Sequence, residues 1–335
     1  MNMRIQREGK TPIRGILDTD GIWLFYGEVL FKLDKINGCW SRIMRIPDLL
    51  ADERIFEFDM LKKNHKILLF PRYINGVCIV DVEEDNFHWI IDDRMAGDHY
   101  VSAGSSEKIW IIPRKNDFFL LESDYSFRHM PELNKKIFKE LERQNLHFVG
   151  FSAHGSYAWN NELVITVATK EKDLFFVLDE ERFIIRRIIA PDGVGGKYVS
   201  VMYENGFLWF QNIKGEDSSV IKLSVSDGMV YEKWDLPKEY GNRVFFRHRD
   251  GSVLVISRKG CVGVIDLKTN NFTTLFDRPS QVLCIDSFQS SGRVLCRNAQ
   301  KLYLIDVINN ASISEYNMPF KSDLEEFLKM IVEKK

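Results

Sequence analysis

Proline, cysteine and long apolar runs are all scarce in this sequence. Its 335 residues include 9 prolines but 24 phenylalanines, a balance that favours β-strands over disordered segments. The five cysteines are odd in number and form no Cys-x-x-Cys pair, as is typical of reduced thiols in a cytoplasmic protein. No stretch reaches the roughly 18 apolar residues of a membrane-spanning helix, and the polar residues 1–10 do not form a secretory signal. We therefore expect a cytoplasmic protein.

Strong net charge is also lacking. Lys and Arg number 46 and Asp and Glu number 48, so the formal charge is −2. Nucleic acids and anionic membranes are bound through an excess of positive charge, and we expect neither as a partner. The motifs GxSxG, Walker loop and GxGxxG are missing as well, so no cofactor is expected.

What the sequence does contain is a repeat. A short apolar segment ending in an acidic or small polar residue occurs seven times, and the steps between its last residues are 47, 41, 57, 45, 42 and 40. A second apolar run precedes each copy, and a proline follows most of them, as expected where an edge strand ends. Each unit therefore predicts four strands. The last residues of the seven segments are Asp34, Asp81, Glu122, Asp179, Ser224, Asp266 and Asp306.

This repeat resembles the β-propeller superfamily over residues 13–319. The resemblance implies an all-β fold of seven four-stranded antiparallel blades, with six or eight blades as the alternative if one copy is spurious. The phased dipeptides of WD40 and kelch repeats and the Asp boxes of sialidases are absent. The similarity to bacterial YVTN-type and streptogramin-lyase-type propellers lies in size and strand order only, and we expect a bacterial protein. The predicted blades are 13–47, 54–93, 98–131, 146–191, 197–237, 242–279 and 282–319.

Two segments break the β pattern, besides an N-terminal segment of residues 1–12. Residues 320–335 carry one apolar helical stripe, which predicts a C-terminal amphipathic helix that packs on the propeller or docks a partner. Residues 132–146 place Leu133, Ile137 and Leu141 on a second stripe, which predicts a short helical insertion between blades three and four. In propellers such a connection lies on the face where ligands usually bind.

The resemblance also implies where a ligand would bind, because the starts of the first strands line the channel mouth of a propeller. Six of the seven residues at these starts can carry positive charge, although Lys, Arg and His together are only 53 of 335 residues (46 + 7). Such a ring would bind a carboxylate, phosphate or sulfate group; the alternative is a solvated rim without a ligand. The seven residues are Arg14, Arg54, His99, His147, Lys197, Arg243 and Gln281.

Two functions follow from this ring. The first is a binding scaffold for an anionic small molecule or a protein partner. The alternative is a lyase or hydrolase acting on an anionic small molecule or peptide, with His99 or His147 as general base and Glu57 or Asp59 orienting it. His99, His147 and Glu57 would also suit a divalent metal ion, but Arg14 and Arg54 would repel a cation, so we expect no metal.

Tryptophans fall on two kinds of predicted strand. Trp23, Trp110 and Trp209 share a position in the second strand and are expected between blades. Trp40, Trp89 and Trp234 lie on outer strands, where they either anchor a partner or pack against the next blade.

Overall fold

The computed structural model describes most of the chain. The described residues are 13–17, 21–26, 29–46, 58–71, 74–95, 99–103, 108–159, 161–191, 194, 196–240, 244–249, 251–257, 260–276, 281–285, 293–298, 300–306 and 312–319. Arg54, Glu57 and Arg243, the N-terminal segment 1–12 and the predicted C-terminal helix in 320–335 lie outside them.

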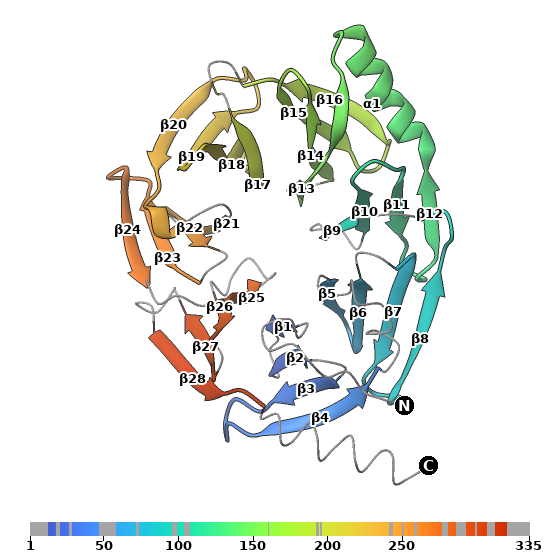
Figure 1. The fold of residues 1–335 in the computed structure, drawn as a ribbon, viewed down its shortest axis with the longest axis vertical. Coiled ribbons are helices and arrows are strands. Elements are labelled where there is room, and N and C mark those ends of the chain that lie inside the picture. Colours follow the sequence, from blue (N-terminus) through green and yellow to red (C-terminus); the bar gives the residue numbers. More distant parts are fainter. Residues whose placement is uncertain are drawn as a thin grey trace. The chain divides into compact units, whose positions relative to one another are not determined.

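The described strands form seven antiparallel sheets, each made of four strands that are consecutive in the sequence (Figure 1). The protein is a seven-bladed β-propeller, as the repeat predicts.

The strands have the following bounds. The first sheet comprises β1 (Ile13–Leu17), β2 (Ile22–Tyr26), β3 (Val29–Leu33) and β4 (Trp40–Arg45). The second comprises β5 (Phe58–Lys63), β6 (Lys66–Pro71), β7 (Gly76–Asp81) and β8 (Asn86–Ile91). The third comprises β9 (His99–Ala103), β10 (Ile109–Pro113), β11 (Phe118–Leu121) and β12 (Phe127–Met130). The fourth comprises β13 (Phe148–Trp159), β14 (Glu162–Thr169), β15 (Asp173–Asp179) and β16 (Ile184–Ile189). The fifth comprises β17 (Lys197–Glu204), β18 (Phe207–Lys214), β19 (Asp217–Ser224) and β20 (Val230–Asp235). The sixth comprises β21 (Val244–Arg249), β22 (Ser252–Ser257), β23 (Val262–Asp266) and β24 (Asn271–Phe276). The seventh comprises β25 (Gln281–Ile285), β26 (Arg293–Arg297), β27 (Lys301–Asp306) and β28 (Ser312–Asn317).

The chain divides into two compact units. The first comprises Met1–Pro71, Cys78–Trp89 and Pro279–Lys335, and the second comprises Arg72–Val77 and Ile90–Arg278. In the first unit β1 lies beside both β25 and β5, so the first and last sheets adjoin without exchanging a strand. In the second unit β13 lies beside β9 and β17, and β17 lies beside β21. Within each unit, therefore, the first strands of successive sheets are neighbours.

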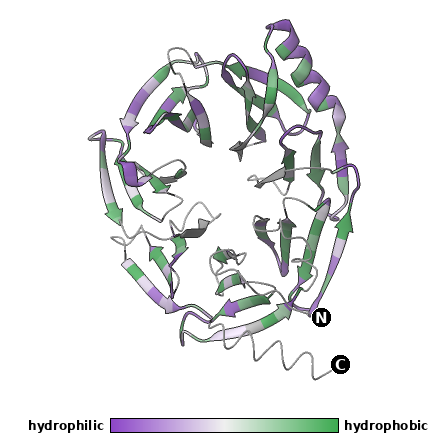
Figure 2. Cartoon of the chain, in the orientation of Figure 1, coloured by the Kyte–Doolittle hydropathy of each residue, from purple (hydrophilic) through white to green (hydrophobic). Residues whose placement is uncertain are grey.

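The middle strands are apolar because neighbouring sheets cover both of their faces. All six residues of β7 and all five of β10 are buried, whereas five of the six residues in β28 are exposed. Figure 2 shows the same contrast, with apolar residues on the second and third strands and polar ones along parts of the fourth strands and α1. Trp23, Trp110 and Trp209 are buried as predicted. Trp234 is buried too, at 5% exposure, and stacks on Trp209 with ring centroids 5.3 Å apart.

The recurring aspartate at the end of the third strand closes the turn into the fourth. In the fourth sheet Asp179 Oδ1 accepts hydrogen bonds from the backbone N–H groups of Glu181 and Arg182, at 2.9 and 2.8 Å. The turn then passes through a left-handed residue, Phe183, at φ 53°. Asp81 and Asp266 make the same pair of bonds in the second and sixth sheets. An acidic side chain recurs because it satisfies two turn N–H groups at once.

The insertion between the third and fourth sheets is the helix α1 (Pro131–Arg143), with a proline in its first turn. Leu133, Ile137 and Leu141 are buried, as their spacing predicts, and α1 packs against β11 and β16 (Figure 1). Asn134 is also buried. Its Nδ2 donates to the carbonyl oxygen of Asn116 at 3.0 Å, and its Oδ1 accepts from the N–H of Phe118 at 3.1 Å. These bonds join the helix to the turn between β10 and β11.

Candidate ligand pocket beside the helical insertion

The residues predicted to bind an anion lie at or near the starts of first strands. His99, Lys197 and Gln281 begin β9, β17 and β25, Arg14 is the second residue of β1, and His147 precedes β13. Only the backbone of His99 and Gln281 is described, and the set is divided between the two compact units. Convergence of these side chains on one opening therefore stays a prediction.

His147 is the predicted residue with the best-defined surroundings. Its backbone N–H donates to Oε2 of Glu171 at 2.9 Å, and its Nδ1 lies 2.6 Å from Oε1 of the same carboxylate. The backbone N–H of His147, followed by its imidazole, lowers the pKa of Glu171 to about 2. The imidazole is 61% exposed, and because Nδ1 is engaged, Nε2 is the ring nitrogen left for a ligand.

Glu171 is the carboxylate in contact with His147. The sequence predicted Glu57 or Asp59 beside a histidine base, and that prediction stays untested because Glu57 lies outside the described residues. Glu171 lies in the turn between β14 and β15, next to Lys170. The pairing of Phe148 with Thr169 in the β13–β14 hairpin brings this turn beside His147. The sequence signal that could have identified Glu171 is the β13–β14 hairpin, because its pairing register determines which turn residue lies beside the start of β13.

A pocket of about 430 Å³ lies beside this ion pair in the second unit. One wall comes from the C-terminal half of α1 and the chain that follows it, and the other from the start of β13 and the β14–β15 turn. Asn145, at φ 55°, ends the helix, and the N–H of Leu146 donates to the carbonyl oxygen of Leu141 at 2.9 Å. This turn folds Leu146 back into the pocket wall. The lining residues are Phe138, Leu141, Glu142, Leu146, His147, Phe148 and Lys170.

Both aromatic and charged residues line the pocket. The rings of Phe138 and Phe148 pack edge to face, 5.0 Å apart. Within the described part of the chain the ammonium of Lys170 forms no ion pair or hydrogen bond, although its backbone N–H donates to the carbonyl oxygen of His147 at 2.9 Å. Glu142 contributes a carboxylate from the helix side. Among the described residues the pocket therefore offers a lysine ammonium without an ion-pair partner and one imidazole nitrogen, with the Glu142 carboxylate in the same lining.

Acidic residues accompany the basic ones along these strand starts. Asp173 Oδ2 accepts the backbone N–H of Tyr198 at 3.2 Å. Burial raises the pKa of Asp173, and the charge of Lys197 opposes that rise. His147 and Lys197 therefore each have a carboxylate nearby, which reduces the positive field that the sequence predicts there.

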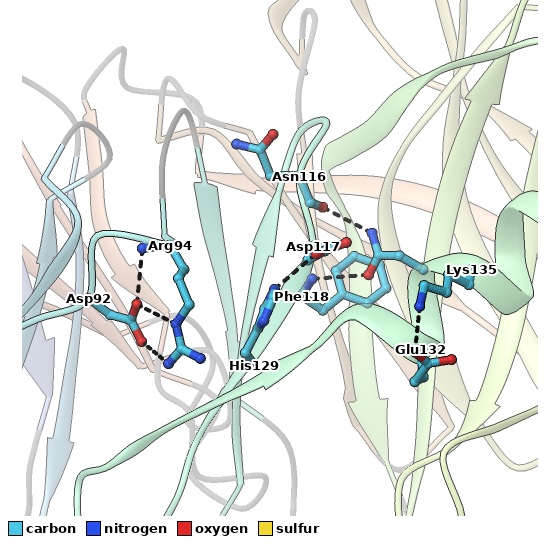
Figure 3. Close-up of polar contacts among 9 residues, drawn as sticks. Asp92, Arg94, Asn116, Asp117, Phe118, His129, Glu132 and Lys135 are labelled. Carbon is cyan, nitrogen blue, oxygen red and sulfur yellow. Dashed lines mark hydrogen bonds and ion pairs between the residues drawn. The ribbon is translucent and has the colours of Figure 1, made fainter.

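A second polar cluster holds the start of α1 and the edge of the third sheet (Figure 3). Asp92 binds the guanidinium of Arg94 through both oxygens, at 2.8 and 2.5 Å. His129 Nε2 lies 2.9 Å from Oδ2 of Asp117, and its ring stacks on Phe119 with centroids 4.9 Å apart. Every one of these groups has a partner inside the fold, so we interpret this cluster as structural.

No metal site or membrane span is found in the described residues. No three of their His, Cys, Asp and Glu side chains are grouped to hold an ion. No helix among them is long and apolar enough to cross a membrane.

Comparison with known proteins establishes the fold. No family model matches the sequence, and no curated protein matches it. The structure is similar to the Pan2 WD40 domain of Neurospora crassa, with a TM-score of 0.58 and 13% identity over 95% of this chain and 93% of that one. It is also similar to a streptogramin B lyase (TM-score 0.56, 12% identity, 94% and 95% covered). The virginiamycin B lyase of Staphylococcus aureus is a third (TM-score 0.54, 12% identity, 96% and 98% covered). At these identities the likeness shows the propeller fold alone, so function has to be argued from this chain's own residues.

Proposed function

We propose that this propeller is a binding protein whose pocket beside α1 takes an apolar group that carries a carboxylate or a similar anion. The observation that supports this is that Lys170 and His147, whose Nε2 is left for a ligand, line one pocket together with Phe138 and Phe148. The volume of about 430 Å³ suits a small ligand or one anchoring side chain. Phe138 and Phe148 would contact the apolar body, and Lys170 would bind the anion.

Two sources offer this chemistry. A free aliphatic or aromatic acid is one, and the C-terminal carboxylate of a partner protein with an apolar last residue is the other. Hexanoate and an acetylated peptide ending in phenylalanine represent the two, and both should stabilise the protein against heat according to RT ln(1 + [L]/Kd).

The test is a pair of lysine variants in the same turn. Lys170→Met should weaken hexanoate binding at least about tenfold, because a charge-assisted hydrogen bond is lost. Lys172→Met removes an equal charge from the same turn. Lys172 does not line the pocket, so this variant should bind hexanoate as tightly as the unaltered protein does. Equal losses in both variants, or equal stabilisation by formate and chloride, would reduce the effect to general screening and contradict the proposal.

The wider anion ring is a separate proposal from the sequence. It adds Arg14, Arg54, His99, Lys197, Arg243 and Gln281 to His147. The double variant Arg54→Met, Arg243→Met tests it, since phosphate should then no longer stabilise the protein.

A second candidate function is a lyase or hydrolase acting on an anionic ligand at the same place. The carboxylate of Glu171 on Nδ1 of His147 supports it, because such a contact orients an imidazole whose Nε2 moves a proton. Two of the similar structures are lyases. Turnover of an anionic ester or lactone that is lost in His147→Gln, while binding persists, would favour the enzyme; an unchanged ligand after long incubation would leave binding alone.

A further inference from the structure

The side chain of Lys222 lies among three aromatic rings of the fifth sheet, in a different sheet from the α1 pocket. Its Nζ is 4.8 Å from the ring centroid of Phe207, 5.3 Å from that of Trp209 and 5.8 Å from that of Tyr231. Oε1 of Glu232 lies 3.6 Å from the same nitrogen. The faces of aromatic rings attract a cation within about 6 Å, so three rings and a carboxylate here surround one positive charge.

The register of the sheet explains how these groups meet. Lys222 on β19 is paired with Trp209 on β18 and with Glu232 on β20, so all three side chains point to one face. Phe207 lies two residues before Trp209 and therefore faces the same way. Tyr231 comes from a bulge in β20, at the register shift between Lys222 and Leu223, and packs edge to face on Phe207 with centroids 5.3 Å apart.

The first sheet shows which part of this arrangement is ordinary packing. Trp23 and Lys32 are paired there in the same way, with Nζ 5.0 Å from the ring. Two residues before the tryptophan, the fifth sheet has Phe207 and the first sheet has Gly21. At the position paired with the lysine, the fifth sheet has Glu232 and the first sheet has Ser41. A Trp–Lys pair thus recurs, whereas the two further rings of Phe207 and Tyr231, and a glutamate at the position paired with the lysine, distinguish the fifth sheet.

The cluster opens to solvent on the side of Tyr231. Tyr231 is 62% exposed and Met229 is 65% exposed, whereas the side chains of Lys222 and Glu232 are only 15% and 29% exposed. Residues at a β-bulge leave the regular ladder, so Tyr231 can adjust to a ligand. The lysine stem is flexible and its ammonium is well solvated in water, so Lys222 can leave the rings without breaking the sheet.

We propose that this cluster is a binding site for an alkylammonium group, in which Lys222 acts as an internal competitor. A quaternary ammonium is well suited to the site, because it has no N–H groups to satisfy and loses its hydration more easily than a lysine ammonium. Phe207, Trp209 and Tyr231 contact its methyl groups, and Glu232 supplies the opposite charge. The inference is independent of the ligand proposed for the α1 pocket.

Removal of the competitor tests the site. Tetramethylammonium, followed by tryptophan fluorescence, should bind Lys222→Ala at least about tenfold more tightly than the unaltered protein. The further change Tyr231→Leu in that background should reverse the gain by roughly the same factor, because one ring face is lost. Lys222→Gln removes the charge but keeps most of the stem, and it should show a smaller gain. It also serves as the readout if the alanine variant does not fold.

Two controls distinguish a cation site from a simple cavity. The double change Lys32→Ala, Lys62→Ala removes both lysines that lie over Trp23, at 5.0 and 5.7 Å from its ring centroid, and should not gain tetramethylammonium binding. The neutral isostere 3,3-dimethylbutanol should bind Lys222→Ala at least about tenfold more weakly than choline. A folded Lys222→Ala or Lys222→Gln that does not bind tetramethylammonium, or that binds the neutral isostere as well as choline, would overturn the proposal. Choline and a peptide with trimethyllysine then separate a free ligand from a protein partner.

Discussion

The pKa values of two aspartates in this protein shift in opposite directions, because the fold places their carboxylates in different surroundings. Asp179 is 3% exposed, and the N–H of Arg182 and the guanidinium of Arg186 bind it at 2.8 and 2.6 Å. The backbone bond from Arg182, then the bond from Arg186, lowers the pKa of Asp179 to about 2. Asp173 lies at the start of β15, where burial instead raises its pKa.

These shifts predict opposite effects of acid. A lowered pKa means that Asp179 stabilises the fold above pH 4 and that this stability is lost as pH falls toward 2. A raised pKa means that Asp173 favours the fold at low pH and that this contribution is lost as pH rises through the raised value. We expect Asp179→Asn to lower the midpoint of urea unfolding at neutral pH. The midpoint of this variant should also decrease less than that of the unaltered protein as the pH falls. Asp173→Asn keeps an acceptor for Tyr198 and should raise the midpoint at neutral pH or leave it unchanged. Shifts of the same sign in both variants would contradict this explanation.

The helix α1 depends on a residue that no apolar pattern marks. Its stripe of Leu133, Ile137 and Leu141 predicts which face is buried. Asn134 is buried beside that stripe, and it determines where the helix is attached, because it binds Asn116 in the β10–β11 turn and Phe118 at the start of β11.

Asn134→Ala should therefore cost about 1–3 kcal/mol in the free energy of unfolding, because the buried N–H of Phe118 loses its acceptor. Urea unfolding measures the loss. Lys139→Ala on the exposed face of the same helix is the control and should change stability by less than about 0.5 kcal/mol. A loss in Asn134→Ala as small as that of the control would show that water replaces the side chain at little cost.

Across the second unit, hydrogen bonds between adjoining sheets recur at the first strands. The N–H of Phe151 donates to the carbonyl oxygen of Arg114 at 2.8 Å and joins the third and fourth sheets. The N–H of Tyr198 joins the fifth sheet to the fourth through Asp173. The N–H of Val244 donates to Oε1 of Gln211 at 2.9 Å and joins the sixth sheet to the fifth. Sheets that contact only their neighbours depend on such interfaces for cooperative unfolding.

Gln211→Leu tests this coupling. Gln211 is fully buried, so the change should cost about 1–3 kcal/mol by leaving the N–H of Val244 unpaired. We also expect a shallower urea transition, because the fifth and sixth sheets become less tightly coupled. Gln144→Leu, at an exposed site after α1, is the control. A loss of stability with an unchanged slope would show that the sheets unfold together without this bond.

The sequence by itself determined the seven sheets, the order of their strands and the helical insertion. Apolar runs, turn residues and helical spacing are local signals, and hairpins pair residues that are close in the chain. The repeated aspartate was equally readable, since its two acceptor bonds are made within three residues of Asp179. These features could be predicted because each depends on neighbours along the chain.

Only the tertiary structure decided the contents of the candidate sites. Glu171 reaches His147 through a hairpin register, the pocket needs α1 and β13 together, and Tyr231 meets Lys222 through a bulge. Each of these contacts depends on how strands are offset and how a helix is seated, and a one-residue slip would move every side chain to the other face. Charge at the strand starts was visible in the sequence, but the carboxylates that accompany His147 and Lys197 became visible only when their turns were folded beside them.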